Sequence, residues 1–282
     1  MSNSRRSFFR DLAAAAARAL PDPTERIEFD TEPPAPLLND SEMERYSRQL
    51  LLPEWSELAQ ISLRDASVLV IGAGALGSPV ASYLVGAGVG RLGLADHDTV
   101  EISNLHRQPL HFTPDAGQLK AESAAAKLRF LNPDVLVEAY PVHVDEENVR
   151  GLVEQQDLLV DCSDSFATRY LVNAACCEAG VPLVEGGVVG WSGLVMSIRP
   201  GETACYRCAF PIEPSGAPSC AEAGVLGPAA GVIGSLQALE ALKLLSGARP
   251  PLTDAFLQVD LATLEVLRVA VARRAECADC GG

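Results

Sequence analysis

Three glycines in the spacing G-x-G-x-x-G come directly after an apolar run at residues 68–71. They are Gly72, Gly74 and Gly77. Such a loop lets backbone N–H groups approach a phosphate at the start of the following helix, where the helix dipole favours negative charge. Asp96 ends a second apolar run about twenty residues further on, where a carboxylate can accept ribose hydroxyls. The pattern predicts the first unit of a nucleotide-binding parallel sheet, a fingerprint that dehydrogenases share.

A polar turn after Asp96 indicates which part of the nucleotide reacts. Residues 103–107 read SNLHR, and Arg107 offers a planar, permanently charged donor fork suited to phosphate oxygens. Lys120 follows within a predicted helix at 118–131 and adds a point charge. Phosphate chemistry depends on positioning and charge neutralisation, so two converging cations favour a reacting triphosphate. A nicotinamide cofactor needs only its pyrophosphate held, and ATP is therefore the predicted ligand.

A second acidic position is predicted at the same edge of the sheet. Asp164 lies in the segment LLVDCSDSFATRY, just after a further apolar run. Ligands of open α/β sheets bind at the carboxyl ends of the strands. A carboxylate there could hold Mg²⁺ on the phosphates, and we therefore predict Mg²⁺ as the catalytic ion.

Four cysteines form two C-x-x-C pairs far apart in the chain. They are Cys205 with Cys208 and Cys277 with Cys280. Either pair alone could be a redox motif or a disulfide, but together they supply the four thiolates of a closed tetrahedral zinc site. No coordination position would remain for water, so the predicted Zn²⁺ is structural and ties the C-terminal tail to the body. The alternative is four unrelated thiols.

Cys220 stands apart from these pairs, in the Pro- and Gly-rich segment APSCAEAGVLGP. That composition predicts a surface loop, where a thiol is available as a nucleophile. The alternative is an incidental thiol. Cys162, Cys176 and Cys177 fall within strand and helix patterns and are predicted to be small core residues.

The elements that must position these residues alternate between strand and helix. Strands are predicted at 68–71, 91–95, 135–140, 158–161 and 182–185. The intervening segments are long enough for right-handed crossovers, which implies a parallel sheet. After Gly186 the pattern predicts antiparallel hairpins, then a helix at 231–245, then two strands joined at Ala262–Thr263. The expected fold class is α/β, a Rossmann-like, mostly parallel sheet flanked by helices and continuing into antiparallel strands.

Composition limits the partners. The chain has 282 residues, a net charge of −15 and 48% hydrophobic residues. A strongly acidic chain with pI near 4.7 is a poor match for nucleic acid or an anionic membrane surface. We also expect no apolar run to approach the roughly 18 residues that a membrane helix needs. We predict one adenine-nucleotide-binding domain at residues 41–282.

Residues 1–40 are predicted to be a separate N-terminal extension. A short alanine-rich helix at 12–20 would precede an acidic, proline-rich linker at 21–39. Arg5 and Arg6 resemble the start of a twin-arginine export signal, but the apolar region is short and interrupted by Arg18. An ATP-consuming enzyme with reduced thiols also fits the cytoplasm, which is the expected location.

These motifs in combination resemble the adenylyltransferases that activate ubiquitin-like sulfur-carrier proteins. The similarity rests on the glycine loop, the Asp-x-Asp at 96–98, SNLHRQ, GQLKAESA and DCSDS, with RYSRQLLLP upstream. It runs from about Glu42 to Cys280. The molybdopterin-synthase group is the most similar, with the thiamine-pathway adenylyltransferase as its sibling. Two positions depart from the family: Ala75 stands where relatives usually have glycine, and Ser165 replaces a more usual asparagine.

The resemblance assigns residues to roles. It implies that Asp164 is the metal-linked catalytic carboxylate, and that Arg48 reaches the ATP site of a second subunit in a homodimer. It aligns Cys220 with a cysteine that can attack an activated carboxyl group or take part in sulfur transfer, and it supports zinc at the two cysteine pairs. The implied nucleotide-binding residues are Gly72, Gly74, Ala75, Gly77, Asp96, Asp98, Ser103, Asn104, Leu105, His106, Arg107, Lys120, Asp164 and Ser165.

The resemblance also implies the reaction. The C-terminal Gly-Gly carboxylate of a small β-grasp carrier would attack the α-phosphorus of ATP, giving an acyl-adenylate and pyrophosphate. A separate sulfur donor, a sulfurtransferase or desulfurase, would then produce the thiocarboxylate for molybdenum cofactor, thiamine or a related sulfur pathway. Three alternatives stay open: a nicotinamide-dependent oxidoreductase, a non-catalytic carrier-binding scaffold, and a relative acting on a tRNA base or a peptide.

Overall fold

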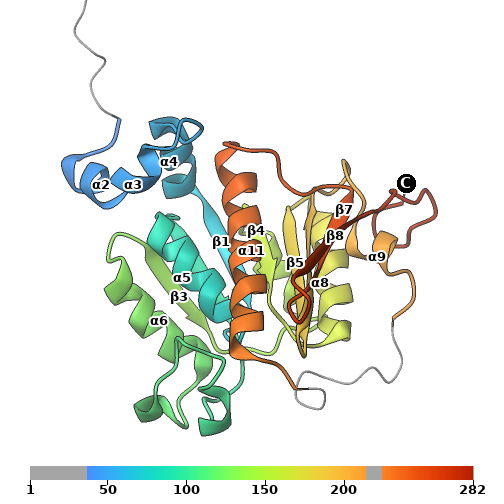
Figure 1. The fold of residues 1–282 in the computed structure, drawn as a ribbon, viewed down its shortest axis with the longest axis horizontal. Coiled ribbons are helices and arrows are strands. Elements are labelled where there is room, and N and C mark those ends of the chain that lie inside the picture. The colour runs from blue at the N-terminus through green and yellow to red at the C-terminus, as the bar shows by residue number, and fades with distance from the viewer. Residues whose placement is uncertain (1–36, 214–223, 282) are drawn as a thin grey trace, which may run out of the picture. The chain divides into compact units, whose positions relative to one another are not determined.

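One sheet of eight strands organises the part of the chain that the computed structural model describes, residues 37–213 and 224–281. The strands lie in the order β3-β2-β1-β4-β5-β6-β7-β8 (Figure 1). β1 to β5 run parallel and β6 to β8 antiparallel, as predicted. Their bounds are β1 Ser67–Ile71, β2 Arg91–Ala95, β3 Leu136–Tyr140, β4 Leu158–Asp161, β5 Leu183–Val189, β6 Ser192–Ile198, β7 Ala255–Asp260 and β8 Glu265–Ala270.

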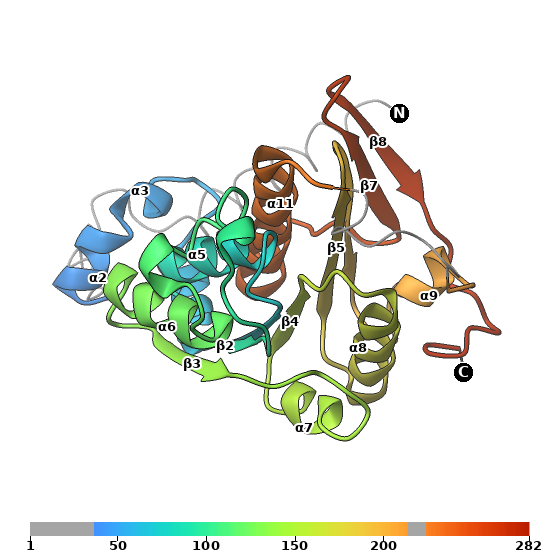
Figure 2. The ribbon, with the colours of Figure 1, turned by 90° about the horizontal axis from the view of Figure 1, so that it is seen from below.

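Helices cover both faces of this sheet. In Figure 2, α5, α6 and α11 lie on one side, and α7 and α8 on the other. The bounds are α2 Asp40–Arg45, α3 Ser47–Leu50, α4 Glu57–Asp65, α5 Gly77–Ala87, α6 Lys120–Leu131, α7 Val149–Val153, α8 Phe166–Ala179, α9 Tyr206–Ala209 and α11 Gly227–Ser246. Two short 3₁₀ turns cover Ile102–Asn104 and Thr113–Asp115.

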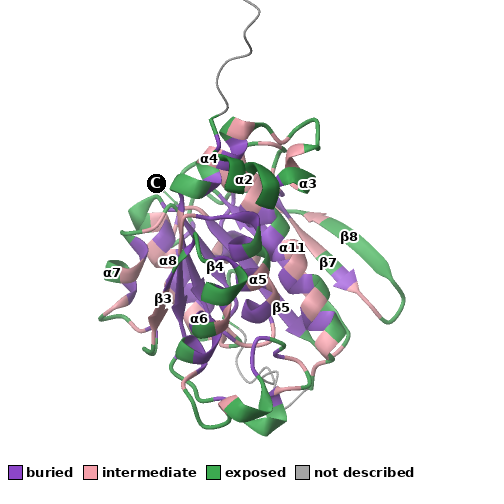
Figure 3. Ribbon diagram, turned by 90° about the vertical axis from the view of Figure 1, so that its left-hand side faces the viewer, coloured by how far each residue is buried: buried purple, intermediate pink, exposed green. Residues whose placement is uncertain are grey.

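The central strands are buried on both faces, which explains their continuous apolar sequence. Along β1, Val68 and Val70 join the core cluster that includes α5, α6 and α11, whereas Leu69 and Ile71 join the cluster on the α8 side. Figure 3 shows the purple, buried strands inside the molecule and β8 largely exposed at the end of the sheet. Alternation along each strand thus divides one apolar run between two cores.

The predicted elements are confirmed with shifts at their ends. β5 continues to Val189, because it pairs with β6 as the predicted hairpin. α11 begins at Gly227, four residues before the predicted start, with Pro228 in its first turn, where no intrahelical N–H is needed. The end of the predicted linker is ordered: Leu38 is 2% exposed and Asn39 caps α2. The helix predicted at 12–20 and Cys220 lie outside the described residues.

α11 contradicts one expectation from composition. Among the described residues, this helix of 20 residues is long and apolar enough, by length and composition alone, to cross a membrane. It packs against α5, β5 and β6, and its buried residues include Ile233 and Ala238. Its apolar character therefore matches its place in the core, where it covers one face of the sheet (Figure 1).

Candidate nucleotide and cysteine sites

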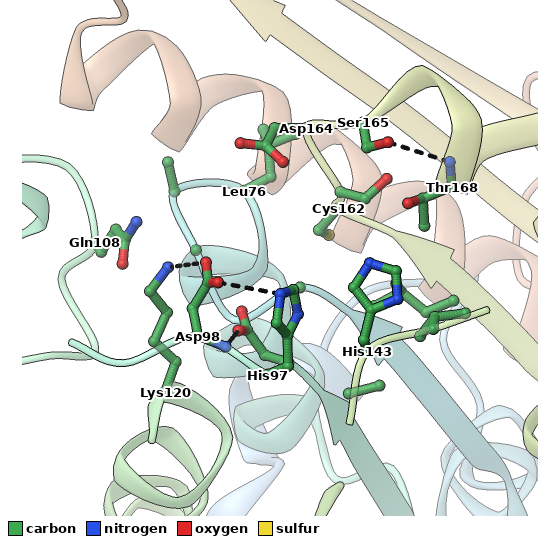
Figure 4. Close-up of a pocket in the computed structure, with 18 of the residues that line it drawn as sticks. Leu76, His97, Asp98, Gln108, Lys120, His143, Cys162, Asp164, Ser165 and Thr168 are labelled. Carbon is green, nitrogen blue, oxygen red and sulfur yellow. Dashed lines mark hydrogen bonds and ion pairs between the residues drawn. The ribbon is translucent and has the colours of Figure 1, made fainter. Parts of the chain in front are cut away.

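A pocket opens at the carboxyl ends of β1, β2 and β4, where the fold predicts a ligand (Figure 4). It brings together residues that are distant in sequence. The predicted site residues that line it are Gly72, Gly74, Ala75, Asp96, Asp98, Arg107, Lys120, Asp164 and Ser165. A nucleotide bound there would meet the glycine loop, two cations and three carboxylates.

The glycine loop has a geometry that only glycine allows at two positions. Gly72 has φ +91°, in the left-handed region. At Gly77, a Cβ would lie 1.8 Å from the carbonyl oxygen of Gly72, so the helix could not start so close to the strand. α5 begins at Gly77 without a side-chain cap. Within α5, Ser78 N already donates to Gly74 O at 3.0 Å and Pro79 has no N–H, so the N–H groups of the loop itself, up to Gly77, are the ones that can meet an anion.

Asp96 holds this loop against the end of β2. Its Oδ2 accepts a hydrogen bond from Ala73 N at 2.7 Å, and its Oδ1 accepts one from Asp98 N at 2.8 Å. The side chain is largely buried and also lines the pocket. Each carboxylate oxygen can accept more than one hydrogen bond, so the loop contacts leave capacity for ligand hydroxyls.

Lys120 and Asp98 form an ion pair at the phosphate end of the pocket. Lys120 Nζ lies 2.8 Å from Asp98 Oδ2, and the lysine side chain is 9% exposed. Burial raises the pKa of Asp98, but the hydrogen bond and charge of Lys120 outweigh it, so the pKa is lowered. The ion pair thus holds a buried lysine, the first residue of α6, in the pocket that the glycine loop also lines.

The SNLHRQ turn contributes differently from the prediction. Arg107 lines the pocket, whereas Ser103, Asn104, Leu105 and His106 do not. These four residues form the turn behind it: Ser103 O accepts from Arg107 Nη1 at 3.0 Å, and His106 Nε2 lies 2.8 Å from the same atom. The turn therefore orients Arg107.

Gln108 is a pocket residue that the sequence reading missed. It is 4% exposed, lines the pocket, and its Oε1 has no hydrogen-bond partner among the described residues. A buried amide oxygen without a partner is costly unless a ligand or water meets it. Its place directly after Arg107 in SNLHRQ was the available signal.

Two histidines, also missed, line the end of the pocket beside Asp96. The rings of His97 and His143 meet edge to face with centroids 4.7 Å apart (Figure 4). His97 Nε2 lies 3.4 Å from Asp98 Oδ1. They follow β2 and β3, 46 positions apart, so sheet pairing brings them together.

Asp164 lies where this pocket meets a second one. It is exposed and precedes Ser165, whose Oγ accepts from Thr168 N at 3.3 Å and caps α8. The second pocket shares Asp164, Arg169 and Val188 with the first. The rest of its lining is mainly apolar: Phe166, Gly187, Val189, Ser192, Gly193, Leu194, Tyr206, Ala209, Phe210, Pro211, Ile212, Phe256 and Gln258. We call it the apolar groove.

The four cysteines of the two pairs meet in one cluster, although their sequence positions lie far apart. The Sγ atoms of Cys205 and Cys277 are 3.6 Å apart and those of Cys208 and Cys280 are 3.4 Å apart, distances at which no disulfide is formed. All four Sγ atoms lie within 4.8 Å of one another and all four residues are buried. This donor set fits a tetrahedral zinc ion.

Polar contacts join the cysteine cluster to α8. Asp279 accepts from Arg207 Nε at 2.7 Å and from Asn173 Nδ2 at 2.6 Å. Burial raises the pKa of the Cys277 thiol, but hydrogen bonds from the backbone of Cys280 and Asp279 outweigh it and lower the pKa to about 7. The pKa values of the other three thiols are raised, so a bound cation would have to stabilise their thiolates.

Gly77 and Arg48 are further predicted site residues that do not line these pockets. Arg48 is exposed in α3 and does not line the nucleotide pocket of its own chain. Cys220 belongs to the segment 214–223, outside the described residues.

Comparison with known proteins gives the family. The ThiF family profile matches residues 46–280. The chain is 47% identical, over 247 residues, to the sulfur carrier protein adenylyltransferase of Thermus thermophilus, covering 85% of this chain and 91% of that protein. It is 44% identical, over 278 residues, to the adenylyltransferase and sulfurtransferase MOCS3 of Sus scrofa, covering 98% of this chain but only 61% of that protein.

Solved structures share the fold. Escherichia coli MccB with MccA-N7isoASN matches with a TM-score of 0.79 at 24% identity, covering 88% of this chain and 77% of that one. PaaA matches with a TM-score of 0.71 at 21% identity, covering 95% and 83%. Since the profile and the relatives span most of the chain, the protein belongs to the ThiF family.

Proposed function

We propose that this protein is an adenylyltransferase that uses Mg·ATP to adenylate the C-terminal glycine of a small ubiquitin-like sulfur-carrier protein. The observation that carries the proposal is one junction: Asp164 lies both in a pocket with the glycine loop and Lys120 and in the apolar groove. Such a junction is where a nucleotide phosphate and a second substrate can meet. The relative from Thermus thermophilus carries this activity in its name.

The nucleotide would lie across the pocket from Asp96 to Lys120. Asp96 binds the ribose, and the N–H groups of the glycine loop with Arg107 and Lys120 bind the phosphates. Gln108 can donate to the same phosphates only from Nε2, since its unpartnered Oε1 is an acceptor. Arg48 reaches the phosphates from a second copy of the chain in a homodimer, which accounts for its place outside the pocket of its own chain. The turn formed by Ser103 to His106 supports Arg107.

Asp164 and Asp98 are the carboxylates that would hold Mg²⁺ beside the phosphates. When bound, Mg²⁺ offsets the negative charge that the triphosphate presents to an incoming carboxylate. Oxygen donors are the ligands that this cation prefers. The pairing of Asp98 with Lys120 makes Asp164 the principal candidate.

The apolar groove would take the C-terminal tail of the carrier and deliver its carboxylate to the junction at Asp164. The carboxylate oxygen forms a bond to the α-phosphorus, the bond from that phosphorus to the bridging oxygen of the β-phosphate breaks, and pyrophosphate leaves. A carboxylate is already a nucleophile at neutral pH, so no general base is required. Placement of the two substrates and neutralisation of phosphate charge supply the catalysis.

The remaining parts of the proposal concern partners and metal. Zn²⁺ at the four-cysteine cluster would be structural, because four thiolates leave no open position. A separate sulfur donor would convert the adenylate to a thiocarboxylate in molybdenum cofactor or a related sulfur metabolism. Cys220 would act in that later transfer rather than in adenylation, so Cys220→Ser should leave adenylate formation unchanged. The cytoplasm suits an ATP-dependent enzyme with reduced thiols.

The test is exchange of labelled pyrophosphate into ATP, with and without a carrier ending in Gly-Gly. We expect exchange that depends on the carrier and is lost when its last glycine is deleted. Exchange with a peptide or tRNA instead would move the activity to another substrate class. Carrier binding without exchange would make the protein a scaffold. An Asp164→Ala variant with full exchange would contradict the role of that carboxylate.

A further inference from the structure

A cluster of three buried ionisable side chains lies directly behind Asp164. Asp161 and Glu185 are both 0% exposed; Asp161 ends β4 and pairs with Glu185, which lies within the neighbouring strand β5. Arg169 of α8 is 6% exposed, and its Nη1 lies 3.3 Å from Glu185 Oε1. Gly187 leaves room for it, since a Cβ there would lie 2.4 Å from Arg169 Nη1.

The cluster contains two carboxyl groups for one guanidinium. Burial raises the pKa of Glu185 well above its usual range, and the nearby Asp161 raises it further. Burial raises the pKa of Asp161 as well. Two buried carboxyl groups beside one guanidinium therefore favour their protonated forms more than free carboxyl groups do. Buried ionic groups often contribute less to stability than apolar residues of similar size would, so stability alone gives little reason for such a cluster.

The same cluster holds the main chain next to Asp164. Arg169 Nη2 donates to Ser163 O at 2.9 Å, and Asp161 Oδ1 accepts from Ser163 N at 2.8 Å. Both main-chain polar groups of Ser163 are thus held by the two charged side chains. Asp164 is the next residue and projects into the junction of the two pockets (Figure 4).

We infer that Arg169 is a positioning residue for adenylation: anchored by Glu185, it fixes the main chain of Ser163 and so sets where the Asp164 carboxylate meets the nucleotide. The inference rests on the proposed function. One arm of the guanidinium forms an ion pair with Glu185, without a hydrogen bond, and the other donates to Ser163 O. An ammonium is a single point charge and cannot reproduce this fork.

The first test compares Arg169→Lys with Arg91→Lys. Arg91 pairs with Glu138 at the same 3.3 Å, but it begins β2 and so lies at the end of the strands opposite to the pocket. We expect Arg169→Lys to lower kcat for pyrophosphate exchange about 10–100-fold, with KM for ATP changed less than about threefold, because a displacement of about 1 Å is costly in an aligned site. Arg91→Lys should leave kcat unchanged. Equal effects of the two substitutions would overturn the inference.

The second test asks whether Arg169 acts through Asp164. In an Asp164→Asn background, Arg169→Lys should change the residual exchange less than about twofold, because the group being positioned is gone. The same loss in both backgrounds would make Arg169 merely structural. If Arg169→Lys fails to fold, Glu185→Gln, which keeps the volume and removes the ionisable carboxyl group, is measured in both backgrounds with the same expectations.

Binding of a non-hydrolysable ATP analogue separates this inference from the proposed function. Calorimetry with and without Mg²⁺ gives the gain in affinity that the cation produces. Arg169→Lys should reduce that gain and leave the Mg²⁺-free affinity unchanged, and an unchanged gain would refute the inference. If wild-type protein binds the analogue but catalyses no pyrophosphate exchange with any carrier that is added, only the proposed function is refuted.

Discussion

Lys120 Nζ lies 2.8 Å from Asp98 Oδ2, although 22 residues separate them in sequence. The lysine begins α6, and the aspartate follows β2. A main-chain bond from Lys120 N to Asp98 O, at 2.8 Å, holds the two segments together. The ammonium is therefore already placed at the pocket before a nucleotide arrives, which reduces the ordering that phosphate binding requires.

Replacement of Lys120 should impair catalysis strongly. Lys120→Met removes a buried cation from the phosphate end of the pocket, and we expect kcat/KM for pyrophosphate exchange to fall about 10²–10³-fold. Lys127→Met on the same helix is the matched control, because Lys127 pairs with Asp115 and does not line the pocket. Steady-state exchange kinetics check both variants, and similar losses in the two would contradict the assigned role.

The glycine loop should tolerate substitution only where space exists. Gly77→Ala would place a Cβ 1.8 Å from Gly72 O, and we expect it to lower the free energy of unfolding by about 1–3 kcal/mol and to weaken nucleotide binding. Gly86→Ala on the same helix meets no atom within 4 Å. It should raise stability by about 0.5–1 kcal/mol, because alanine favours the helix. Urea unfolding measures both, and a neutral Gly77→Ala would show that the loop can relax.

Loss of one cysteine of the cluster should release the metal. Cys208→Ser is expected to reduce bound zinc from one per chain to a small fraction and to lower the melting temperature, because metal binding and folding are coupled. Cys176→Ala is the control: it changes a core cysteine outside the cluster and should keep zinc. Elemental analysis of the purified proteins measures the bound zinc, and wild-type protein that contains no zinc would refute the prediction.

The free energy of unfolding should fall as the pH drops through the range in which His111 takes up a proton. Burial lowers the pKa of His111 below its ordinary value of 6.5, although the hydrogen bond to Ala73 O opposes this. The unfolded chain therefore binds the proton first. The contribution to stability is present above pH 6.5 and is lost as the pH falls toward the lower folded pKa, at up to about 1.4 kcal/mol per pH unit. Urea unfolding between about pH 7 and 5.5 should lose this slope in His111→Gln, and an unchanged slope would exclude His111 as its source.

Complementation tests whether Arg48 acts across a dimer. Arg48→Ala and Lys120→Ala should each be nearly inactive as homodimers. After subunits of the two variants are mixed and exchanged, each heterodimer has one intact site if Arg48 acts in trans, and about a quarter of wild-type activity should return. No recovery, with heterodimers verified by mass spectrometry, would place Arg48 outside the partner's site.

Local sequence patterns predicted most of the strands and the short motifs of this protein. Apolar runs and glycine spacing predicted β1 to β4 nearly residue for residue, because strand burial and tight turns depend on neighbouring residues. The same holds for the glycine loop and the two C-x-x-C pairs. The predicted end of β5 was less accurate, because its last residues form a strand only through pairing with β6.

The composition of the sites was decided by the tertiary structure. A bridge between Thr99 and Leu119 brings Asp98 to Lys120, and folding joins four cysteines from two distant segments. Arg169 carries no local signal of its own and Gln108 has only its position after Arg107, so both are placed in the site by the elements that surround them. Sequence alone determined which chemistry this chain can perform, because residue types and short spacings are local properties. Only the fold decided which side chains share a pocket, because burial and distance are set by packing between elements far apart in the chain.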